Sequence, residues 1–103
     1  MTEMKIPPIH PGEILKEDFL LPMNISESKL SAEIKLKEKQ INNIIKNKAS
    51  INANVALRLG IYFGTGAQFW LKLQMKYDIA IAEDQLEDLL KNEIRPVQNV
   101  AYV

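Results

Sequence analysis

Residues 26–48 read SESKLSAEIKLKEKQINNIIKNK, and the spacing of their apolar residues decides the fold of the chain. Leu30 and Ile34 are four residues apart, which places both side chains on one face of a helix. Leu36 follows after two residues and breaks the helical period, and isoleucines at helical spacing resume within residues 41–45. Two short helices around a tight turn form a helix-turn-helix, a motif whose second helix enters the major groove of DNA.

The second of these helices is polar on the side away from its isoleucines. Asparagine and glutamine can make two hydrogen bonds to adenine, and lysine can donate to guanine or to phosphate. The candidates for base reading are Lys39, Gln40, Asn42 and Asn43. The candidates for phosphate contacts are Lys37, Lys46 and Lys48. An ordinary solvent-exposed helix carries the same residue types, so this face alone leaves both interpretations open.

Two positions depart from the usual pattern of the motif. Lys35 lies in the turn, where glycine is more usual, and a left-handed conformation there would cost about 1–2 kcal/mol. The second helix also has no serine, threonine or aspartate near Lys37 to cap its first turn.

The composition is that of an ordinary globular domain. The chain has 103 residues, of which 47% are hydrophobic and 25% charged, the size and balance of a single domain. Its apolar runs are too short for a membrane-spanning helix or a secretory signal. The absence of cysteine excludes disulfide bonds and thiolate metal sites. We expect a cytoplasmic protein.

The net charge is zero, but the charges are not evenly distributed. Residues 1–28 carry a net charge of −3, residues 29–77 carry +7, and residues 78–103 carry −4. The positive charge coincides with the predicted helix-turn-helix, as phosphate binding requires. The acidic C-terminal segment suits a surface that contacts protein and not DNA.

We divide the chain into an irregular arm at residues 1–9, a helix-turn-helix domain at residues 10–78 and an acidic extension with one helix at residues 79–103. His10 and Pro11 open the first helix, since proline suits the first helical position, and Pro22 stops it soon after Leu21. Ser26 caps the next helix.

Further local signals mark the later helices. Asn52 is expected to cap a helix that Gly64 ends. Thr65 and Gln68 have the spacing of a capping box. Residues 79–82 are expected to form a short extended link, after which Asp84 begins the last helix.

A stripe of large apolar residues follows the predicted capping box. It consists of Phe69, Trp70, Leu73 and Tyr77. Such a stripe at helical spacing is usually buried, so we expect these side chains to pack in the core or in a dimer interface.

The sequence does not favour an enzyme. His10, the single histidine, lies in the helix-opening motif, where a structural or capping role is expected. The acidic pairs Glu17–Asp18 and Glu87–Asp88 are sequence neighbours, which point to different sides of a helix. The motifs of phosphate-binding loops, dinucleotide sites and zinc proteases are absent. We predict no catalytic residue, no metal site and no cofactor.

Several segments carry a more specific pattern. They are HPGEIL at residues 10–15, INNIIKNKASI at residues 41–51, ALRLGIYFGTGAQFWLKLQMKYD at residues 56–78 and IRP at residues 94–96. Together they resemble the HigA-type antitoxins, within the lambda-repressor-like (XRE) class of helix-turn-helix proteins. The resemblance implies an all-α, lambda-repressor-like domain of five core helices with an additional C-terminal helix.

The resemblance also implies a function. Such an antitoxin pairs with a HigB-type toxin, an mRNA-cleaving RNase, and as a dimer binds operator DNA to repress its own toxin–antitoxin operon. The base-reading positions would be Gln40, Asn42 and Asn43 with the flanking lysines. The chain departs from the family pattern at Glu27, Lys35 and Lys37, where relatives often have glutamine, glycine and serine.

Two other functions fit the same fold. The chain could be a stand-alone transcriptional repressor without a toxin, or a protein-interaction module whose helix-turn-helix no longer reads DNA. A small basic RNase-like reading frame beside the gene would favour the antitoxin.

Overall fold

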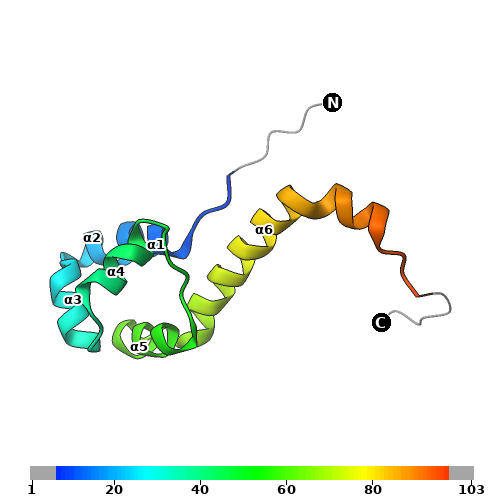
Figure 1. The fold of residues 1–103 in the computed structure, drawn as a ribbon. Coiled ribbons are helices and arrows are strands. Elements are labelled where there is room, and N and C mark those ends of the chain that lie inside the picture. The colour runs from blue at the N-terminus through cyan, green and yellow to red at the C-terminus, as the bar shows by residue number, and fades with distance from the viewer. Residues whose placement is uncertain (1–6, 98–103) are drawn as a thin grey trace.

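The structure, a computed structural model, describes residues 7–97, and the regular elements within that range are all helical. Figure 1 shows the short helices gathered into a bundle, from which the C-terminal half of the last helix, α6, projects. This arrangement confirms the predicted all-α class. Residues 1–6 and 98–103 lie outside the described residues, so the predicted arm at residues 1–9 is seen only from Pro7 onward, where it is irregular.

The first helical segment runs through three consecutive elements. These are α1 (Pro11–Ile14), the π-helix η1 (Leu15–Leu20) and α2 (Leu21–Met23). The segment ends soon after Leu21, as expected, but Pro22 does not itself end it. The chain turns at Asn24, whose φ of 55° is left-handed. The wider π-helical turns move the preceding carbonyls away from the proline ring, so Pro22 fits inside the segment.

The predicted helix-turn-helix is present as α3 (Glu27–Ile34) and α4 (Glu38–Ile45). The Ser26 hydroxyl accepts a hydrogen bond from the backbone N–H of Lys29 over 3.0 Å, which confirms the predicted cap of α3. This cap satisfies one of the N–H groups that the first turn of a helix leaves without an intrahelical partner.

The turn between α3 and α4 keeps the expected geometry without a glycine. Lys35 adopts a left-handed conformation with a φ of 62°. The backbone N–H of Leu36 then donates to the Ser31 carbonyl over 3.0 Å. This is the hydrogen bond of a Schellman-type helix end, so the surrounding structure holds Lys35 in its strained conformation.

The next helix, α5 (Ala53–Phe63), has the predicted ends. The Asn52 side chain accepts a hydrogen bond from the backbone N–H of Val55 over 2.9 Å, and Gly64 ends the helix with a φ of 74°. A Cβ atom at Gly60 would collide with the backbone of Gly66, so the start of α6 passes directly against α5.

The last helix, α6 (Ala67–Glu93), corrects two predictions. The capping box of Thr65 and Gln68 is not formed, because the helix begins after Gly66 and the Thr65 hydroxyl donates to the Gly66 carbonyl over 2.9 Å. The extended link at residues 79–82 is also wrong, because the helix continues through it, and Asp84 therefore lies within α6 and does not begin a separate helix. No glycine or proline interrupts α6, and branched isoleucines lower helix propensity only slightly.

The core lies where η1, α3, α4, α5 and α6 meet. Trp70 is completely buried there, with its ring 4.9 Å from the ring of Phe19. The other buried apolar residues are Leu15, Leu20, Leu30, Ile34, Ile41, Ile44, Ile51, Val55, Ala56 and Leu59. From the predicted apolar stripe, Leu73 and Tyr77 are half-buried, whereas Phe69 is 37% exposed at the edge of the core. None of the helices within residues 7–97 combines the length and the apolar character needed to cross a membrane.

Candidate nucleic-acid interface

The inner side of α4 is fixed against the bundle. Ile41 and Ile44 are buried, and Ile45 is half-buried. Behind them, α1 approaches so closely that a Cβ atom at Gly12 would collide with the backbone carbonyl of Ile44. The missing side chain at Gly12 therefore lets α1 support α4 directly.

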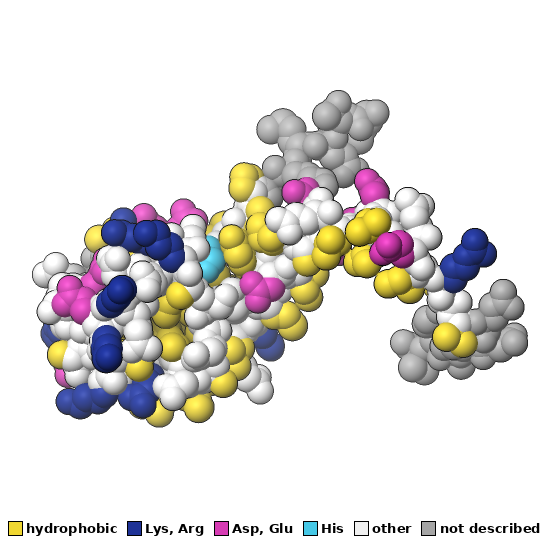
Figure 2. Space-filling view, in the orientation of Figure 1, with side chains coloured by type: hydrophobic (Ala, Val, Ile, Leu, Met, Phe, Trp, Pro, Cys, Tyr) yellow, Lys and Arg dark blue, Asp and Glu magenta, His cyan; other side chains and the backbone are white. Residues whose placement is uncertain are grey.

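The outer side of α4 is open and basic. Residues three or four positions apart share a helix face, so Lys39, Asn43 and Lys46 lie opposite Ile41 and Ile44. The two lysines are exposed, and Asn43 is half-buried. Figure 2 shows lysine and arginine side chains gathered over the helical bundle, with several acidic side chains along α6. A rigid helix with this outer surface can enter a DNA groove and meet both base edges and phosphates.

Gln40, a predicted base-reading residue, has a second role in the structure. Its side-chain Oε1 accepts a hydrogen bond from the backbone N–H of Lys37 over 3.1 Å. This contact supplies part of the cap that the sequence lacks at the start of α4. The side-chain NH₂ group of Gln40 remains a donor for another partner, and the residue is exposed.

Asn42, another predicted base-reading residue, contacts the first helix of the motif. Its Nδ2 donates a hydrogen bond to Oε1 of Glu27 over 3.0 Å, and both residues are half-buried. The predicted base readers therefore lie together on one short helix. Lys39 and Asn43 are on its outer side, whereas Asn42 is on the flank that faces α3.

The predicted phosphate contacts lie at the two ends of α4. Lys37 precedes the helix, Lys46 ends it, and Lys48 lies in the following loop, and all three are exposed. The loop is held by the Asn43 carbonyl, which accepts from the backbone N–H of Lys48 over 2.8 Å. The end of α4 therefore fixes the backbone position of Lys48.

Two side chains that the sequence analysis missed hold this unit in place. The Nη1 of Arg58 donates to the Ile34 carbonyl at the end of α3 over 2.8 Å, and its Nε donates to the Asn54 side chain over 2.7 Å. Gln74 of α6 is buried, and its Oε1 accepts from the backbone N–H of Ile51 over 2.8 Å. The four-residue spacing of Asn54 and Arg58 was a usable signal for their contact, but no spacing links either side chain to its distant backbone partner.

His10 has the structural role that the sequence predicts. It is buried, and its Nδ1 accepts a hydrogen bond from the backbone N–H of Gly12 over 2.9 Å, which caps α1. Burial lowers the pKa of His10 from 6.5, and the Asp78 carboxylate and the Ala49 carbonyl partly oppose this shift. The neutral ring suits the cap, because a protonated Nδ1 could not accept a hydrogen bond. Among the described residues, no cluster of histidine or acidic side chains could hold a metal ion.

Proteins of similar sequence are named as virulence-associated proteins, as an antitoxin and as HTH-type transcriptional regulators. Virulence-associated protein I of Dichelobacter nodosus is 41% identical over 85 residues, which span 82% of this chain and 79% of that protein. Antitoxin HigA-1 of Vibrio cholerae is 33% identical over 79 residues, which span 77% of this chain and 74% of that antitoxin. No protein-family model matches the chain.

A solved structure has the same fold and shows a bound nucleic acid. The Pseudomonas aeruginosa antitoxin HigA with the higBA promoter superposes with a TM-score of 0.84 and is 41% identical. The match covers 87% of this chain and 98% of that antitoxin.

Proposed function

This chain belongs to the family of HigA-type antitoxins, and on that premise we propose that it represses its own toxin–antitoxin operon and neutralises a HigB-type, mRNA-cleaving toxin. Repression requires the protein to bind operator DNA as a dimer, with one α4 helix in each half-site. The observation that carries the proposal is the exposed basic outer side of α4, supported from behind by buried isoleucines.

The residues of the proposed DNA-binding surface have two different roles. Lys39, Gln40, Asn42 and Asn43 are the base-reading candidates, and Lys37, Lys46 and Lys48 are the phosphate-contacting candidates. The hydrogen bonds described above use one hydrogen-bonding group of Gln40 and one of Asn42. Each side chain still has a donor or an acceptor for a base. Lys39 and Asn43, directly opposite the core, have the least obstructed path to the groove.

The projecting part of α6 supports a dimer. Its apolar side chains Ile79, Leu86, Leu89 and Leu90 are 40–51% exposed, an unusual density for a helix that faces only water. Two copies that pack along these residues would bury them and would place two α4 helices on one duplex. For a two-fold dimer, the half-sites are then about 34 Å apart, one turn of the DNA helix.

The acidic extension supports the contact with the toxin. Residues 78–103 carry a net charge of −4, and a groove of about 380 Å³ lies between Pro8 and the middle of α6. The apolar lining of this groove includes Ile14, Leu73 and Tyr77. Glu83 and Asp84 line an adjoining pocket that shares Pro8 and Ala80 with this groove, and acidic side chains at this place suit a basic protein partner and repel DNA.

Two measurements test the proposal. Nuclease protection of the DNA upstream of the gene should show two half-sites one helical turn apart at protein concentrations that maintain the dimer. Affinity purification of the tagged protein from its native host should recover a small basic RNase. Protection without a recovered toxin would identify a stand-alone repressor. If neither protection nor a toxin is observed, the proposal loses its basis.

A further inference from the structure

We propose that Glu27 is a positioning residue for base recognition: it holds the Asn42 amide in the orientation that reads an adenine. The inference rests on the proposed DNA binding and extends it to a residue of α3, outside the recognition helix. Glu27 itself is not assigned any contact with DNA.

The geometry of the pair carries the inference. Glu27 is the first residue of α3, and Asn42 lies near the middle of α4, fifteen positions later. The hydrogen bond from Asn42 Nδ2 to Glu27 Oε1 is 3.0 Å long and partly buried. An amide can rotate by half a turn about its last bond, but a carboxylate only accepts hydrogen bonds. Glu27 therefore selects the Asn42 rotamer that directs NH₂ toward α3.

The remaining hydrogen-bonding groups of Asn42 match one base. After one N–H is used by Glu27, Asn42 retains a second N–H and the carbonyl oxygen. Adenine presents an acceptor at N7 and a donor at N6 in the major groove, and a side-chain amide pairs with both. The free N–H of Asn42 can donate to N7 while its oxygen accepts from N6. The two base contacts and the Glu27 hydrogen bond together use both N–H groups and the carbonyl oxygen of the Asn42 amide.

The location of the carboxylate argues for a specific function. Residues 29–77 carry nine basic and two acidic residues, and a carboxylate beside this basic surface weakens phosphate binding through its charge. A contact that only joined α3 to α4 would not need that charge, because the buried face of both helices already packs them together through Leu30, Ile34 and Ile41. Orientation of a reading side chain is a function for which a fixed acceptor is required.

The experiment compares two duplexes and four variants. One duplex is enriched by the wild-type chain from a randomised pool, and the other is a scrambled duplex of the same base composition. The variants are Glu27→Gln, Glu27→Ala, Asn42→Ala and the double variant Glu27→Ala/Asn42→Ala. Affinity is measured for both duplexes, and the ratio of the two affinities is the readout. Thermal unfolding of each variant confirms that it is folded at the temperature used.

The expected results follow from the hydrogen bonds. Asn42→Ala lowers the affinity ratio by about 5- to 150-fold, the range for one bidentate base contact. Glu27→Ala lowers the ratio by about 2- to 10-fold, because Asn42 must then be ordered on binding. Glu27→Gln keeps an oxygen within reach of Asn42, but its amide can also turn a donor toward Asn42, so its ratio lies between those of the wild type and Glu27→Ala. Both substitutions remove the same charge and raise affinity for both duplexes alike. The double variant matches Asn42→Ala, since the two residues act through one contact.

Base-pair substitution supplies the second readout. Replacement of the adenine read by Asn42 lowers wild-type affinity, has little effect on the Asn42→Ala variant and has a smaller effect on Glu27→Ala than on the wild type. The inference is overturned if Glu27→Ala leaves the ratio at the wild-type value, changes both affinities by one factor, or behaves as Glu27→Gln does. A wild-type chain that does not discriminate between the duplexes overturns the proposed function itself, and the inference with it.

Discussion

The side chain of Gln74 accepts a hydrogen bond from the backbone N–H of Ile51 over 2.8 Å and so joins α6 to the loop that follows the recognition helix. Both residues are buried. The Nε2 atom of the same side chain donates to Oδ1 of Asp78 over 2.9 Å. The loop that carries Lys48 is thereby attached to the helix that we assign to dimerisation.

Removal of the Gln74 amide should therefore destabilise the domain. Gln74→Leu keeps the volume but leaves the buried N–H of Ile51 without a partner, which costs about 1–3 kcal/mol. The free energy of unfolding in urea measures the effect. Gln68→Leu, at an exposed position of the same helix, is the control and should change stability by less than about 0.5 kcal/mol. Equal stabilities of the two variants would show that the Ile51 contact is not maintained in solution.

A second prediction concerns the support of α4 by α1. Gly12→Ala places a Cβ atom against the backbone carbonyl of Ile44, which cannot move as a flexible side chain would. We expect a loss of about 1–3 kcal/mol, the usual cost of overpacking, together with weaker DNA binding. Lys16→Ala, exposed on the adjoining π-helix, serves as the comparison. Unchanged stability of Gly12→Ala would mean that α1 does not approach α4 as described.

The buried His10 predicts a pH dependence. Because burial lowers its pKa below 6.5, the unfolded chain binds more protons than the folded chain once the pH falls toward that value. Stability is therefore complete above pH 6.5 and decreases as the pH falls below it. His10→Asn keeps an acceptor for Gly12 and cannot be protonated. The stability of this variant should therefore lack the pH dependence that His10 contributes. The facing groups are the Tyr77 ring, the Ala49 carbonyl and Asp78, which the substitution leaves in place.

The check is a comparison of unfolding free energies at pH 7.5 and about 5.5 for the wild type and His10→Asn. The wild type should lose more stability than the variant over this range. An identical loss in both proteins would assign the pH dependence to other groups, such as the carboxylates of α6.

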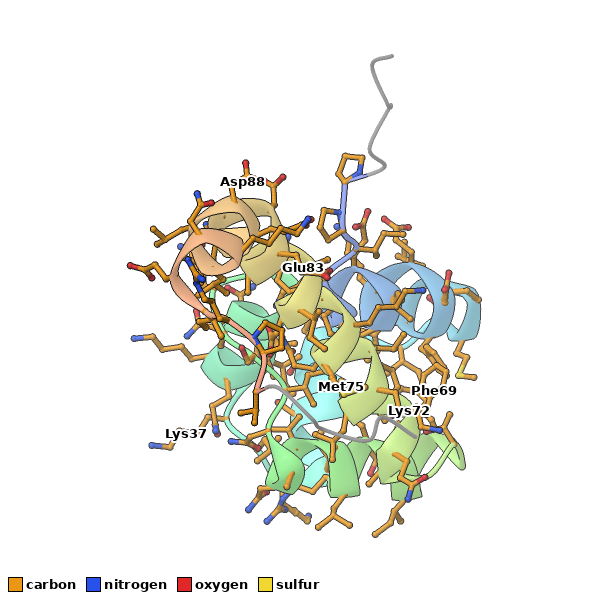
Figure 3. The ribbon with its side chains drawn as sticks, turned by 90° about the vertical axis from the view of Figure 1, so that its right-hand side faces the viewer. Lys37, Phe69, Lys72, Met75, Glu83 and Asp88 are labelled. Carbon is orange, nitrogen blue, oxygen red and sulfur yellow. The ribbon has the colours of Figure 1, made fainter. Side chains whose placement is uncertain are left out.

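The acidic part of α6 should contribute to protein binding alone. In Figure 3, Asp88 lies on the projecting end of α6, far along the chain from Lys37 at the start of α4. The double substitution Glu83→Lys/Asp88→Lys should leave operator affinity within about twofold and weaken toxin binding at least tenfold, because rim charges repel a partner of like sign. Lys72→Glu, on the bundle end of α6, is the matched exposed control. Weaker operator binding by the charge-reversed dimer would contradict this assignment.

Local signals in the sequence predicted much of the fold. The caps at Ser26 and Asn52 and the buried face of Ile41 and Ile44 depend on residues within one or two helical turns, and all are present. The continuity of α6 was missed because residues 79–82 alternate branched isoleucine with alanine. Such a short apolar run fits a strand or a helix, and the helix on either side decides it here.

The contacts that hold the candidate site could not be predicted in the same way. Asn42 meets Glu27 over fifteen positions, and Arg58 meets the Ile34 carbonyl over twenty-four. These pairs form only when the helices pack, and a backbone carbonyl leaves no trace in the sequence. The residue types on α4 identified the surface, but only the packed structure separated the outer side of the helix from the flank that faces α3.

The most direct test of DNA reading by α4 is a salt titration of binding to operator and scrambled duplexes for Asn43→Ala and Lys48→Ala. Asn43→Ala should cost about 1–3 kcal/mol on the operator and little on the scrambled duplex, as expected for a lost base contact. Lys48→Ala should weaken both complexes alike and reduce the salt slope by about one unit, as expected for a lost phosphate contact. If the two variants instead behave identically on both duplexes, the outer side of α4 does not read the operator.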